Sequence, residues 1–478
     1  MALSSHRTPA SHGSLDAGAN SGARCPSTLA TARRRVLTLR VRGSAPQRGA
    51  DVRNAHEPNR FGTELEAPSS LKESDMTLRS KWFVPLALVA AVALAGCAGN
   101  KSADEIVVGE YGSLTGNEAN FGQSTKEGVE LALAELQASD QGKIGGLTVR
   151  TLVEDDRGLP EEAVTVVKKL INQDGVCAVL GEVASSRSIA AASVCQDAGV
   201  PMISPSSTNP KVTQQGDYIF RMCFIDPFQG TVMAKFAALN LKLKTVAILE
   251  DVRNDYSVGL TQYFTEAFTS LGGAIASGKP QAYNAGDTDF RSQLTAIKAM
   301  KPEAIYVPGY YTDVGLIARQ ARELGITAPL LGGDGWESEK LLEIGGEALN
   351  GSYYSNHFAV DNPDPRLQGF LKNYKTKFGK EPDAIGGLAY DAARVLFLSM
   401  QQLHTQDPAA FAGLGSSKTG SPARRAATQK LRDIIAGTKE FPGVSGMITL
   451  DANRNASKPA VVIEVKAGKK VYNTTVNP

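Results

Sequence analysis

Residues 176–204 read VCAVLGEVASSRSIAAASVCQDAGVPMIS and contain the unit that decides the fold. The runs VCAVLG (176–181) and PMIS (201–204) are short, apolar and bounded by Gly, Pro or polar residues, as strands are. The segment between them, SIAAASVCQDAG (188–199), reads as a helix. Two apolar strands joined by a helix are typical of a parallel sheet whose faces are covered by helices.

The same alternation of strand and helix continues along the chain from Ile106 to Gly333. Between the strand-like runs, apolar residues follow helical spacing in 129–136, 164–171 and 317–324. The sequence therefore predicts an α/β fold of mostly parallel sheets flanked by helices. The further runs that read as strands are IVVG (106–109), LTVRTLV (147–153), TVAILE (245–250), AIYVPG (304–309) and PLLGG (329–333).

A pause in this alternation divides the chain into two lobes. The pause is FIDPFQ (224–229), and each half beside it could form a sheet of its own. We expect residues 104–225 plus 357–440 to form an N-terminal lobe and residues 226–356 plus 441–478 to form a C-terminal lobe. Ligands of such folds bind at the carboxyl ends of the strands, so the cleft between the lobes is the expected binding place.

The C-terminal part of the chain is expected to complete both lobes. A helical pattern runs from Pro365 to Leu403, and a further helix is predicted over 423–435, after a Gly/Ser-rich loop. The alternating strands GMITLD (446–451) and AVVIEVKAG (460–468) could pair as a hairpin. The passages between the lobes are expected to form a hinge with three crossovers, near 224–227, 355–360 and 441–444.

Residues 76–97, MTLRSKWFVPLALVAAVALAGC, read as a lipoprotein export signal. Arg79 and Lys81 precede an apolar run of about 15 residues, which is shorter than the roughly 20 that a membrane-spanning helix needs. Small residues then lead to Cys97, the pattern required for cleavage and lipidation. We expect 76–96 to be a signal peptide, Cys97 to carry a lipid, and 97–103 to be a tether; a buried apolar helix is the alternative.

Residues 1–75 match no packed domain, because they are rich in Ser, Ala, Gly and Arg and show no sustained period. We expect them to be a disordered or untranslated extension, since a signal normally begins at its methionine, here Met76. A basic arm for nucleic acid is the alternative, although an exported protein has little use for one. The extension carries a charge of +4 and the signal +2, so the rest of the chain is mildly acidic and no nucleic-acid partner is expected.

Cysteine and histidine use argues against a metal site or a cofactor. No CxxC occurs, and the part after the signal has only His357 and His404. Cys177, Cys195 and Cys223 allow at most one disulfide, and the default expectation is three buried, inert thiols.

Two strand ends of the first lobe carry clusters of hydroxyl groups. Ser185 and Ser186 stand at the start of the helix that follows VCAVLG, and Ser206, Ser207 and Thr208 follow PMIS. Hydroxyls beside the free N–H groups of a helix N-terminus can bind a carboxylate. Ordinary capping and a plain turn are the alternatives.

The strand ends of the second lobe carry aromatic residues and one acid. Tyr256 and Tyr310 follow two of the strands, and Asp334 lies between two glycines after a third. The aromatics could cover a ligand or fill the seam between the lobes, and Asp334 could receive an ammonium group or act as a turn or cap. With the hydroxyls opposite, these residues would match both charged ends of an amino acid.

At this point the chain resembles a known family, the periplasmic branched-chain amino acid binding proteins. These are type I solute-binding proteins of ABC importers, and the similarity covers about 104–475. The motifs that carry it include IVVGEYGSLTG, FGQSTKEGVELALAEL, GEVASSRS, VPMISPSSTNPKVT, DYSVGL, YVPGYYTDVG and GGDGW.

The resemblance implies a two-lobed binding protein, without enzymatic activity, that captures an amino acid of branched-chain or related type. Its partners would be an ABC permease and ATPase, and it would act as a monomer, lipid-anchored in the periplasm or at the cell surface. Ligand-binding roles fall on Ser185, Ser206 and Thr208 of the first lobe, on Asp334 of the second, and on the aromatics Phe121, Tyr256 and Tyr310.

Two other functional classes fit less well. A sensor module of the same fold would bind an amino acid, amide or urea without transport, and neighbouring genes would distinguish it. An exported enzyme is not expected, because the sequence after the signal has no GxSxG, no Walker-type GxxxxGK[ST] and no HExxH.

Overall fold

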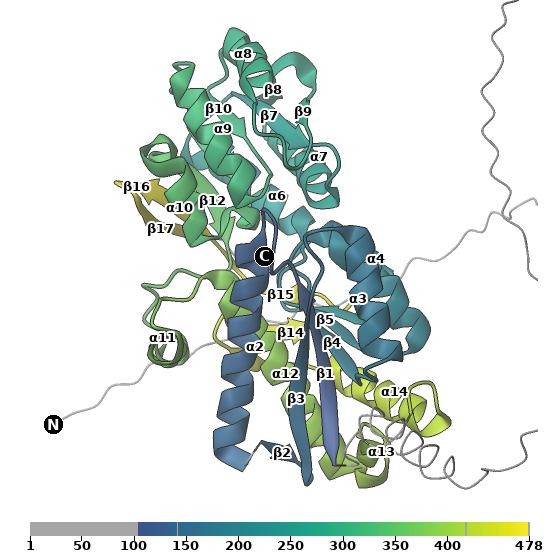
Figure 1. Cartoon of the computed structure of the whole chain (residues 1–478). Helices are drawn as coiled ribbons and strands as arrows, with labels where there is room; N and C mark the ends of the chain where they lie inside the picture. Colours follow the sequence, from purple (N-terminus) through teal and green to yellow (C-terminus); the bar gives the residue numbers. More distant parts are fainter. Residues whose placement is uncertain (1–103, 141, 416–417, 477–478) are drawn as a thin grey trace, which may run out of the picture. The chain divides into compact units, whose positions relative to one another are not determined.

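The computed structural model describes residues 104–476, except for 141 and 416–417 (Figure 1). The predicted extension (1–75), signal (76–96) and lipidation site Cys97 lie outside the described residues.

The first lobe is built on a six-stranded sheet in the order β2-β3-β1-β4-β5-β6. All neighbouring pairs are parallel except β2 and β3, which are antiparallel. Each predicted strand of this lobe lies within an observed one, or contains its central residues. The strands are β1 (Glu105–Gly112), β2 (Lys143–Ile144), β3 (Leu147–Asp155), β4 (Ala178–Leu180), β5 (Met202–Ser204) and β6 (Ile219–Arg221).

Alternate residues of these strands point into two separate hydrophobic cores. Ile106 and Leu180 pack in one core with α2 and α12, while Val107 and Val179 pack in the other with α3 and α4. This two-sided burial explains the continuous apolar runs of the strands. The helices of this lobe are α2 (Ala119–Asp140), α3 (Pro160–Asn172), α4 (Ser185–Ala198), α5 (Lys211–Gln214), α11 (Pro365–Phe378), α12 (Ala384–Gln406), α13 (Pro408–Ala412) and α14 (Pro422–Ala436).

The second lobe contains an eight-stranded sheet, whose path is β17-β16-β12-β11-β10-β7-β8, with β9 paired to β7. The strands from β8 to β12 are parallel, whereas β16 and β17 are antiparallel additions at one edge. The bounds are β7 (Thr245–Asp251), β8 (Ala274–Ile275), β9 (Gln281–Tyr283), β10 (Ala304–Tyr306), β11 (Leu330–Gly332), β12 (Ser352–Asn356), β16 (Ala460–Lys466) and β17 (Lys469–Val476).

Helices cover both faces of this second sheet. Val246 and Ile248 pack with α6 and α7, whereas Ala247 and Leu249 pack with α8, α9 and α10. The two-lobed α/β architecture predicted from the sequence is therefore confirmed. The helical segments are α6 (Asp226–Lys235), η1 (Phe236–Asn240), α7 (Asp255–Ser270), η2 (Ala276–Gly278), α8 (Arg291–Met300), α9 (Tyr311–Glu323), η3 (Asp334–Trp336), α10 (Glu339–Gly345) and η4 (Gly346–Leu349).

The expected hairpin between 446–451 and 460–468 is wrong. The first segment forms β14 (Gly446–Leu450), the middle strand of a small sheet with β13 (Phe441–Gly443) and β15 (Ala456–Ser457). The second segment forms β16, which pairs with β12 and β17. The turn between them prevents the pairing, because Arg454 donates hydrogen bonds to the carbonyls of Thr213 and Ile219 in the first lobe.

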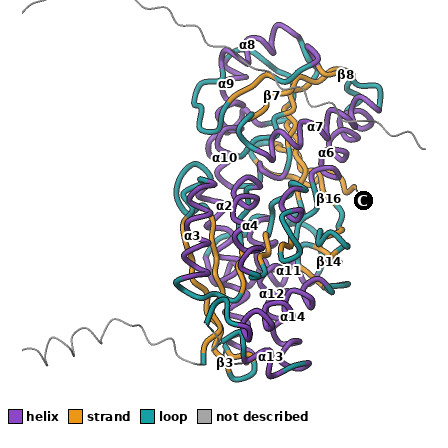
Figure 2. The backbone as a smooth tube through the Cα atoms, turned by 90° about the vertical axis from the view of Figure 1, so that its right-hand side faces the viewer, coloured by secondary structure: helices purple, strands orange, loops and turns teal. Residues whose placement is uncertain are grey.

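The last boundary between the lobes differs from the expected one at 441. Ile448 and Leu450 are buried in the first-lobe core beside α12 and α14, a neighbourhood that Figure 2 shows from the side. The chain returns to the second lobe only after β15, so the three crossovers lie at about 222–226, 357–364 and 457–460. The expected third crossover at 441–444 therefore lies inside the first lobe.

The long helical pattern of 365–403 is interrupted in the structure. Helix α11 ends at Phe378, and Gly379 follows with a φ of 74°, a left-handed conformation that glycine adopts without strain. Helix α12 then starts after Asp383, whose side chain accepts a hydrogen bond from the Gly386 amide.

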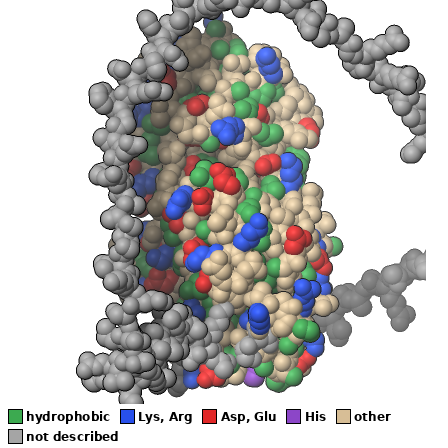
Figure 3. Space-filling model, turned by 45° about the vertical axis from the view of Figure 1, so that its right-hand side comes forward, with side chains coloured by type: hydrophobic (Ala, Val, Ile, Leu, Met, Phe, Trp, Pro, Cys, Tyr) green, Lys and Arg blue, Asp and Glu red, His purple; other side chains and the backbone are tan. Residues whose placement is uncertain are grey.

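Charged side chains of both signs are interspersed on the face drawn in Figure 3, in agreement with the absence of a basic patch in the sequence. None of the described helices is long and apolar enough to cross a membrane. Among the described residues, no group of three or more His, Cys, Asp or Glu side chains could hold a metal ion.

Candidate ligand-binding site

The strand ends of the two lobes meet at the cleft. Helix α4 of the first lobe begins at Ser185, and its capping residue Ala184 offers no side chain to the first turn. Ser185 is buried, and its Oγ accepts a hydrogen bond from the Asn209 amide at 3.2 Å. This contact joins the predicted serine to the hydroxyl-rich loop after β5. The N-terminus of α4 therefore presents hydroxyl and amide groups to the cleft without a side-chain cap.

The loop at 205–210 is held by buried hydrogen bonds on the side away from the cleft. Ser207 Oγ donates to the Glu182 carbonyl at 2.9 Å, and the Arg221 guanidinium donates to the carbonyls of Ser207 and Asn209 at 2.5 and 2.8 Å. Arg221 has no exposed surface. Because these bonds fix the residues on both sides of it, Thr208 has a defined position, and its buried hydroxyl forms a hydrogen bond with the Asp226 carboxyl group.

Asp334 of the second lobe lies at the centre of the site. It is 3% exposed. Its Oδ1 accepts a hydrogen bond from the Tyr256 hydroxyl at 3.0 Å, and its Oδ2 lies 2.9 Å from His357 Nε2 and 3.5 Å from Ser206 Oγ. Ser206 belongs to the opposite lobe, so the predicted acid and the predicted hydroxyl loop do meet across the cleft.

The glycines beside Asp334 are required by this close packing. A Cβ atom on Gly333 would lie 2.5 Å from the Tyr256 hydroxyl, and one on Gly335 would lie 2.8 Å from Tyr310 Cδ1. Real Cβ contacts are longer than this. The Gly-Asp-Gly sequence therefore lets two tyrosines approach the acid closely.

The rings of the three predicted aromatics contact one another beside Asp334. Tyr256 and Tyr310 are stacked with ring centroids 5.3 Å apart, and Phe121 of the first lobe meets Tyr310 edge-on at 5.4 Å. Such edge-on and stacked pairs are favourable arrangements of aromatic rings. The stack crosses the cleft, which fits both the ligand-covering and the seam-filling interpretation.

Two side chains that the sequence did not identify as site residues also contact Asp334. His357 is buried, contacts Oδ2 and stacks on Phe224 with ring centroids 4.0 Å apart. Gln229 Oε1 accepts hydrogen bonds from the Asp334 amide and from Ser355 Oγ, both at 2.7 Å. His357 stands at the second crossover and Gln229 in the first turn of α6, just after the first one, so position near a predicted hinge was the signal that could have identified them.

Burial controls the charge state of the groups around Asp334. Burial and the neighbouring Asp334 carboxylate raise the pKa of Asp226 to about 8, against the opposing effects of Thr208 and Arg221. Burial lowers the pKa of His357, and the hydrogen bond to Asp334 offsets only part of that effect. His357 is therefore largely neutral at neutral pH and supplies no full counter-charge to Asp334, and Asp226 is largely protonated, so that it adds little negative charge beside Asp334.

Two buried polar atoms in this region have no hydrogen-bond partner in the described part of the chain. They are His357 Nδ1 and Lys458 Nζ. Buried polar groups in proteins nearly always have a partner. Asp334 contacts residues of both lobes, and the unsatisfied groups beside it are therefore consistent with a binding place for a polar ligand or ordered water.

The lobes are closed over this region in the structure. Ser186 Oγ of α4 donates to Asp255 Oδ2 of α7 at 3.1 Å and accepts from the Asp255 amide at 2.9 Å. Asn209 and Lys211 also bind Asp255, at 2.7 and 2.9 Å. On the other side of the cleft, Asn120 donates to the Tyr311 hydroxyl at 3.1 Å.

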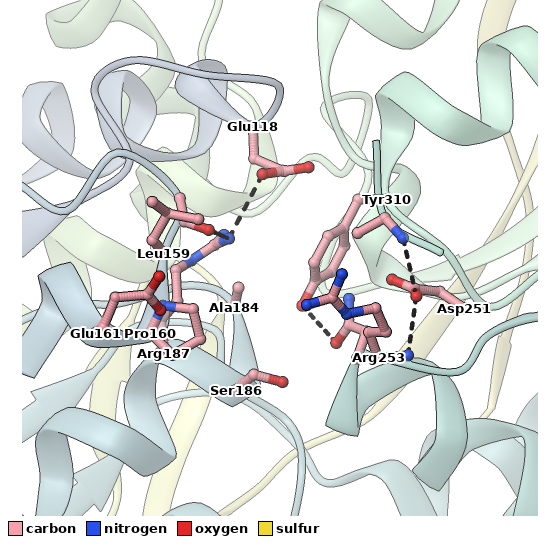
Figure 4. Close-up of a pocket in the computed structure, with 13 residues that line it drawn as sticks. Glu118, Leu159, Pro160, Glu161, Ala184, Ser186, Arg187, Asp251, Arg253 and Tyr310 are labelled. Carbon is pink, nitrogen blue, oxygen red and sulfur yellow. Dashed lines mark hydrogen bonds and ion pairs between the residues drawn. The ribbon is translucent and has the colours of Figure 1, made fainter. Parts of the chain in front are cut away.

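A cavity of about 310 Å³ lies at the mouth of the closed cleft. Figure 4 shows Glu118, Ala184 and Arg187 of the first lobe facing Asp251 and Tyr310 of the second across it. Arg187 is buried and forms ion pairs with Glu118 and Glu182 at 3.5 and 3.2 Å. Tyr310 is the only one of the seven predicted ligand-binding residues that lines this cavity.

Contacts join five of the predicted ligand-binding residues across the cleft, namely Phe121, Tyr310, Tyr256, Asp334 and Ser206. Ser185 and Thr208 lie in adjoining segments of the first lobe, and the roles of all seven residues in binding stay a prediction. The cysteines agree with the default expectation, since Cys177, Cys195 and Cys223 are buried and free. Burial raises the pKa of Cys177 to about 11 and that of Cys223 to about 12, which makes these thiols unreactive.

A fold of two lobes, each built on a mostly parallel sheet and closed over a polar cleft, is typical of the two-lobed solute-binding proteins. The sequence profile of the periplasmic binding protein family matches residues 105–470, so the chain belongs to this family of binding proteins, which are not enzymes. The resemblance noted in the sequence is confirmed.

Relatives and solved structures agree with this assignment. The chain is 32% identical to the leucine-, isoleucine-, valine-, threonine- and alanine-binding protein of Pseudomonas aeruginosa, over 67% of this chain and 85% of the relative. A leucine-binding protein from Thermotoga maritima is 36% identical, with a TM-score of 0.69 over 78% of this chain and 99% of that one. A branched-chain amino acid transporter substrate-binding protein from Streptococcus pneumoniae, solved with isoleucine, is 30% identical, with a TM-score of 0.69 over 78% and 100%.

Proposed function

We propose that this chain is the extracytoplasmic substrate-binding protein of an ABC importer and that it captures an α-amino acid, of branched-chain or related type, between its lobes. The observation that carries the proposal is the meeting of Asp334 with the hydroxyl loop of the opposite lobe. Asp334 Oδ2 and Ser206 Oγ lie 3.5 Å apart, and Thr208 of the same loop is buried.

The charges of the site support a zwitterionic ligand. Ser185, Thr208 and the uncapped N-terminus of α4 offer hydrogen-bond donors to a carboxylate, whereas Asp334 and the Ser206 hydroxyl offer acceptors to an ammonium group. The two ends of an α-amino acid would thus bind to different lobes. A ligand held in this way favours closure, because only the closed state makes both sets of contacts.

The ligands of related proteins support the same class of substrate. The Pseudomonas relative is a binding protein for leucine, isoleucine, valine, threonine and alanine, and the Streptococcus structure holds isoleucine. Phe121, Tyr256 and Tyr310 would cover the side chain of such a ligand. We assign to the ligand-binding set the seven residues named from the sequence, with delivery to a permease and its ATPase as the following step.

A panel of compounds tests the class of ligand. The twenty amino acids, urea, small amides and γ-aminobutyrate are added to the protein and its thermal unfolding is followed. A true ligand present at a hundredfold excess over its Kd should stabilise the protein by about 2.7 kcal/mol. Stabilisation by an amide or urea, and by no α-amino acid, would contradict the proposal.

The anchor is the second part of the proposal. Cys97 follows an export signal, and we propose that it carries a lipid that holds the protein at the outer side of a membrane as a monomer. Labelling with a fatty acid in vivo, compared between the unchanged protein and Cys97→Ala, tests the anchor. Label that persists in the variant would contradict it.

A further inference from the structure

We infer that His357 is a positioning residue of the ammonium subsite, and that the ligand's ammonium group and a proton on the His357 ring exclude one another. The inference rests on the proposed function and adds a component to the site: a buried imidazole that holds Asp334 in place while neutral and competes with the ligand when charged.

The geometry places His357 where it can orient the acid. Its Nε2 lies 2.9 Å from Asp334 Oδ2, and its side chain has no exposed surface. The ring stacks on Phe224 at 4.0 Å. Phe224 belongs to the first crossover and His357 to the second, so the imidazole is fixed by the segments that join the two lobes.

The state of the ring follows from its surroundings. A neutral imidazole that donates Nε2–H to Asp334 keeps its lone pair on Nδ1, and Nδ1 has no partner among the described residues. The other oxygen of Asp334 accepts a hydrogen bond from the Tyr256 hydroxyl. The acid is thereby aimed at the Ser206 loop, where the ammonium group is proposed to bind.

The charged and titratable groups that face His357 have opposing effects on its pKa. Asp334 favours a charged ring and Glu337 does so more weakly, whereas burial and the Lys458 ammonium disfavour it, and the net effect is a lowered pKa. Lys458 is itself buried, and burial lowers its pKa to about 8. On the first crossover, Asp226 is largely protonated at neutral pH, since its pKa is raised to about 8.

Protonation of this ring would replace the ligand's charge. An imidazolium at His357 would neutralise Asp334 and repel an ammonium group bound to the same carboxylate. Binding at acid pH must then release the proton from His357. Linkage requires the apparent affinity for the amino acid to fall by about tenfold for each pH unit below the pKa of the ring. By the same linkage, a bound amino acid must lower the pKa of His357.

The test measures Kd by titration calorimetry on the full chain, from about pH 7.5 to about pH 5, where histidines change charge. The probe is L-isoleucine, or the amino acid that binds most tightly at the upper pH. We expect Kd to be constant near neutrality and to rise in acid. His357→Gln should remove most of this rise, because the glutamine amide can still donate to Asp334 but does not titrate.

His404→Gln is the matched control. His404 lies in α12 of the first lobe, outside the site, so this variant should keep the pH dependence of the unchanged protein. A flat Kd in the unchanged protein, or a full acid rise that persists in His357→Gln, would overturn the inference. The rise would then belong to the carboxylates.

A ligand-free measurement keeps the inference testable if His357→Gln does not fold. Nuclear magnetic resonance of the imidazole nitrogens should show a ring that is protonated at Nε2 near neutral pH and titrates below 6.5, the usual value for histidine. Addition of the amino acid should move the titration to lower pH. If no amino acid binds at pH 7.5, the proposed function fails; if one binds but leaves the His357 titration unchanged, only the present inference fails.

Discussion

Asp334 is a buried acid to which the ammonium group of the ligand is proposed to bind. Two of its neighbours, Tyr256 and His357, donate hydrogen bonds to it, and both are largely neutral at neutral pH. A buried carboxylate without a full counter-charge is costly, and a ligand ammonium group would remove that cost. The free energy of ligand binding should therefore depend strongly on this charge.

Replacement of Asp334 by Asn tests the charge with little change of shape. We expect Asp334→Asn to weaken amino-acid binding by about 3 kcal/mol, or roughly a hundredfold, because the ammonium group would lose its charged partner. Titration calorimetry measures the change. Asp433→Asn, at an exposed acid of α14, serves as the control and should bind normally. An unchanged affinity in Asp334→Asn would show that the ammonium group binds elsewhere.

Variants of Thr208 and Thr261 separate the effect of a lost threonine hydroxyl on protein stability from its effect on ligand binding. The Thr208 hydroxyl is buried and forms a hydrogen bond with the Asp226 carboxyl group, so Thr208→Val should lower the free energy of unfolding by about 1 kcal/mol. The same change should weaken binding by about 1–3 kcal/mol, because a hydrogen bond to the ligand carboxylate would be lost. Thr261→Val, at another buried threonine whose hydroxyl contacts a carboxyl group, that of Glu250, should have a similar effect on stability and leave the affinity unchanged. Equal affinities in both variants would remove Thr208 from the site.

At the scale of elements, helix α4 connects the binding site to closure of the lobes. Its first residue, Ser185, contacts the loop after β5, and its second, Ser186, binds Asp255 at the start of α7 in the other lobe. The same helix turn thus faces the proposed carboxylate subsite and the inter-lobe contact. Loss of the inter-lobe contact should shift the population toward open lobes without removing a ligand contact.

Ser186→Ala removes two hydrogen bonds that join α4 to α7. We expect the affinity for the amino acid to fall by a few fold, because each such bond contributes about 1 kcal/mol to the closed state. Small-angle scattering of the ligand-free protein should show a larger radius of gyration than in the unchanged chain. Ser193→Ala, at an exposed serine of the same helix, should change neither quantity. If scattering and affinity are the same in both variants, Ser186 does not stabilise closure.

Strand β1 contains a second buried acid whose effect is on stability. Burial raises the pKa of Glu110 from 4.5 to about 8, with Lys126 opposing and Glu130 reinforcing the shift. Between these two values the folded chain keeps a proton that the unfolded chain has released. The free energy of unfolding should therefore fall as pH rises through this window.

Glu110→Gln should remove this pH dependence. The variant should match the unchanged protein near pH 4.5 and exceed it in stability by roughly 3–5 kcal/mol near pH 8, since each pKa unit corresponds to about 1.4 kcal/mol. Urea unfolding at the two pH values measures the difference. Glu105→Gln, at the half-buried start of the same strand, is the control. A variant that is no more stable than the unchanged protein near pH 8 would show that Glu110 is ionised at little cost.

At the scale of the whole molecule, the sequence predicted the two lobes because their strands are buried on both faces. Runs such as TVAILE are continuous and apolar for that reason, and they coincide with strands such as β7. The sequence did not indicate in the same way which lobe each C-terminal strand would join. GMITL and AVVIEVK have similar alternating patterns, and only the folded chain shows that Ile448 and Leu450 pack in the first-lobe core whereas the second strand pairs with β12.

The same distinction applies to the site. Ser185, Thr208 and Asp334 follow strands directly, so the sequence could place them at the cleft. His357 reaches Asp334 from a crossover and Gln229 from the first turn of α6, and the orientation of His357 depends on its packing on Phe224. Local sequence carries little information about such packing between distant segments.

The central claim is that both charged ends of one amino acid are bound, each by a different lobe. Titration calorimetry with L-leucine, L-leucinamide and 4-methylpentanoate tests it directly, because each analogue lacks one charged end. We predict that leucine binds and that each analogue binds at least about a hundredfold more weakly. Binding of 4-methylpentanoate as tight as that of leucine would contradict the claim, since Asp334 would then have no ammonium group to hold.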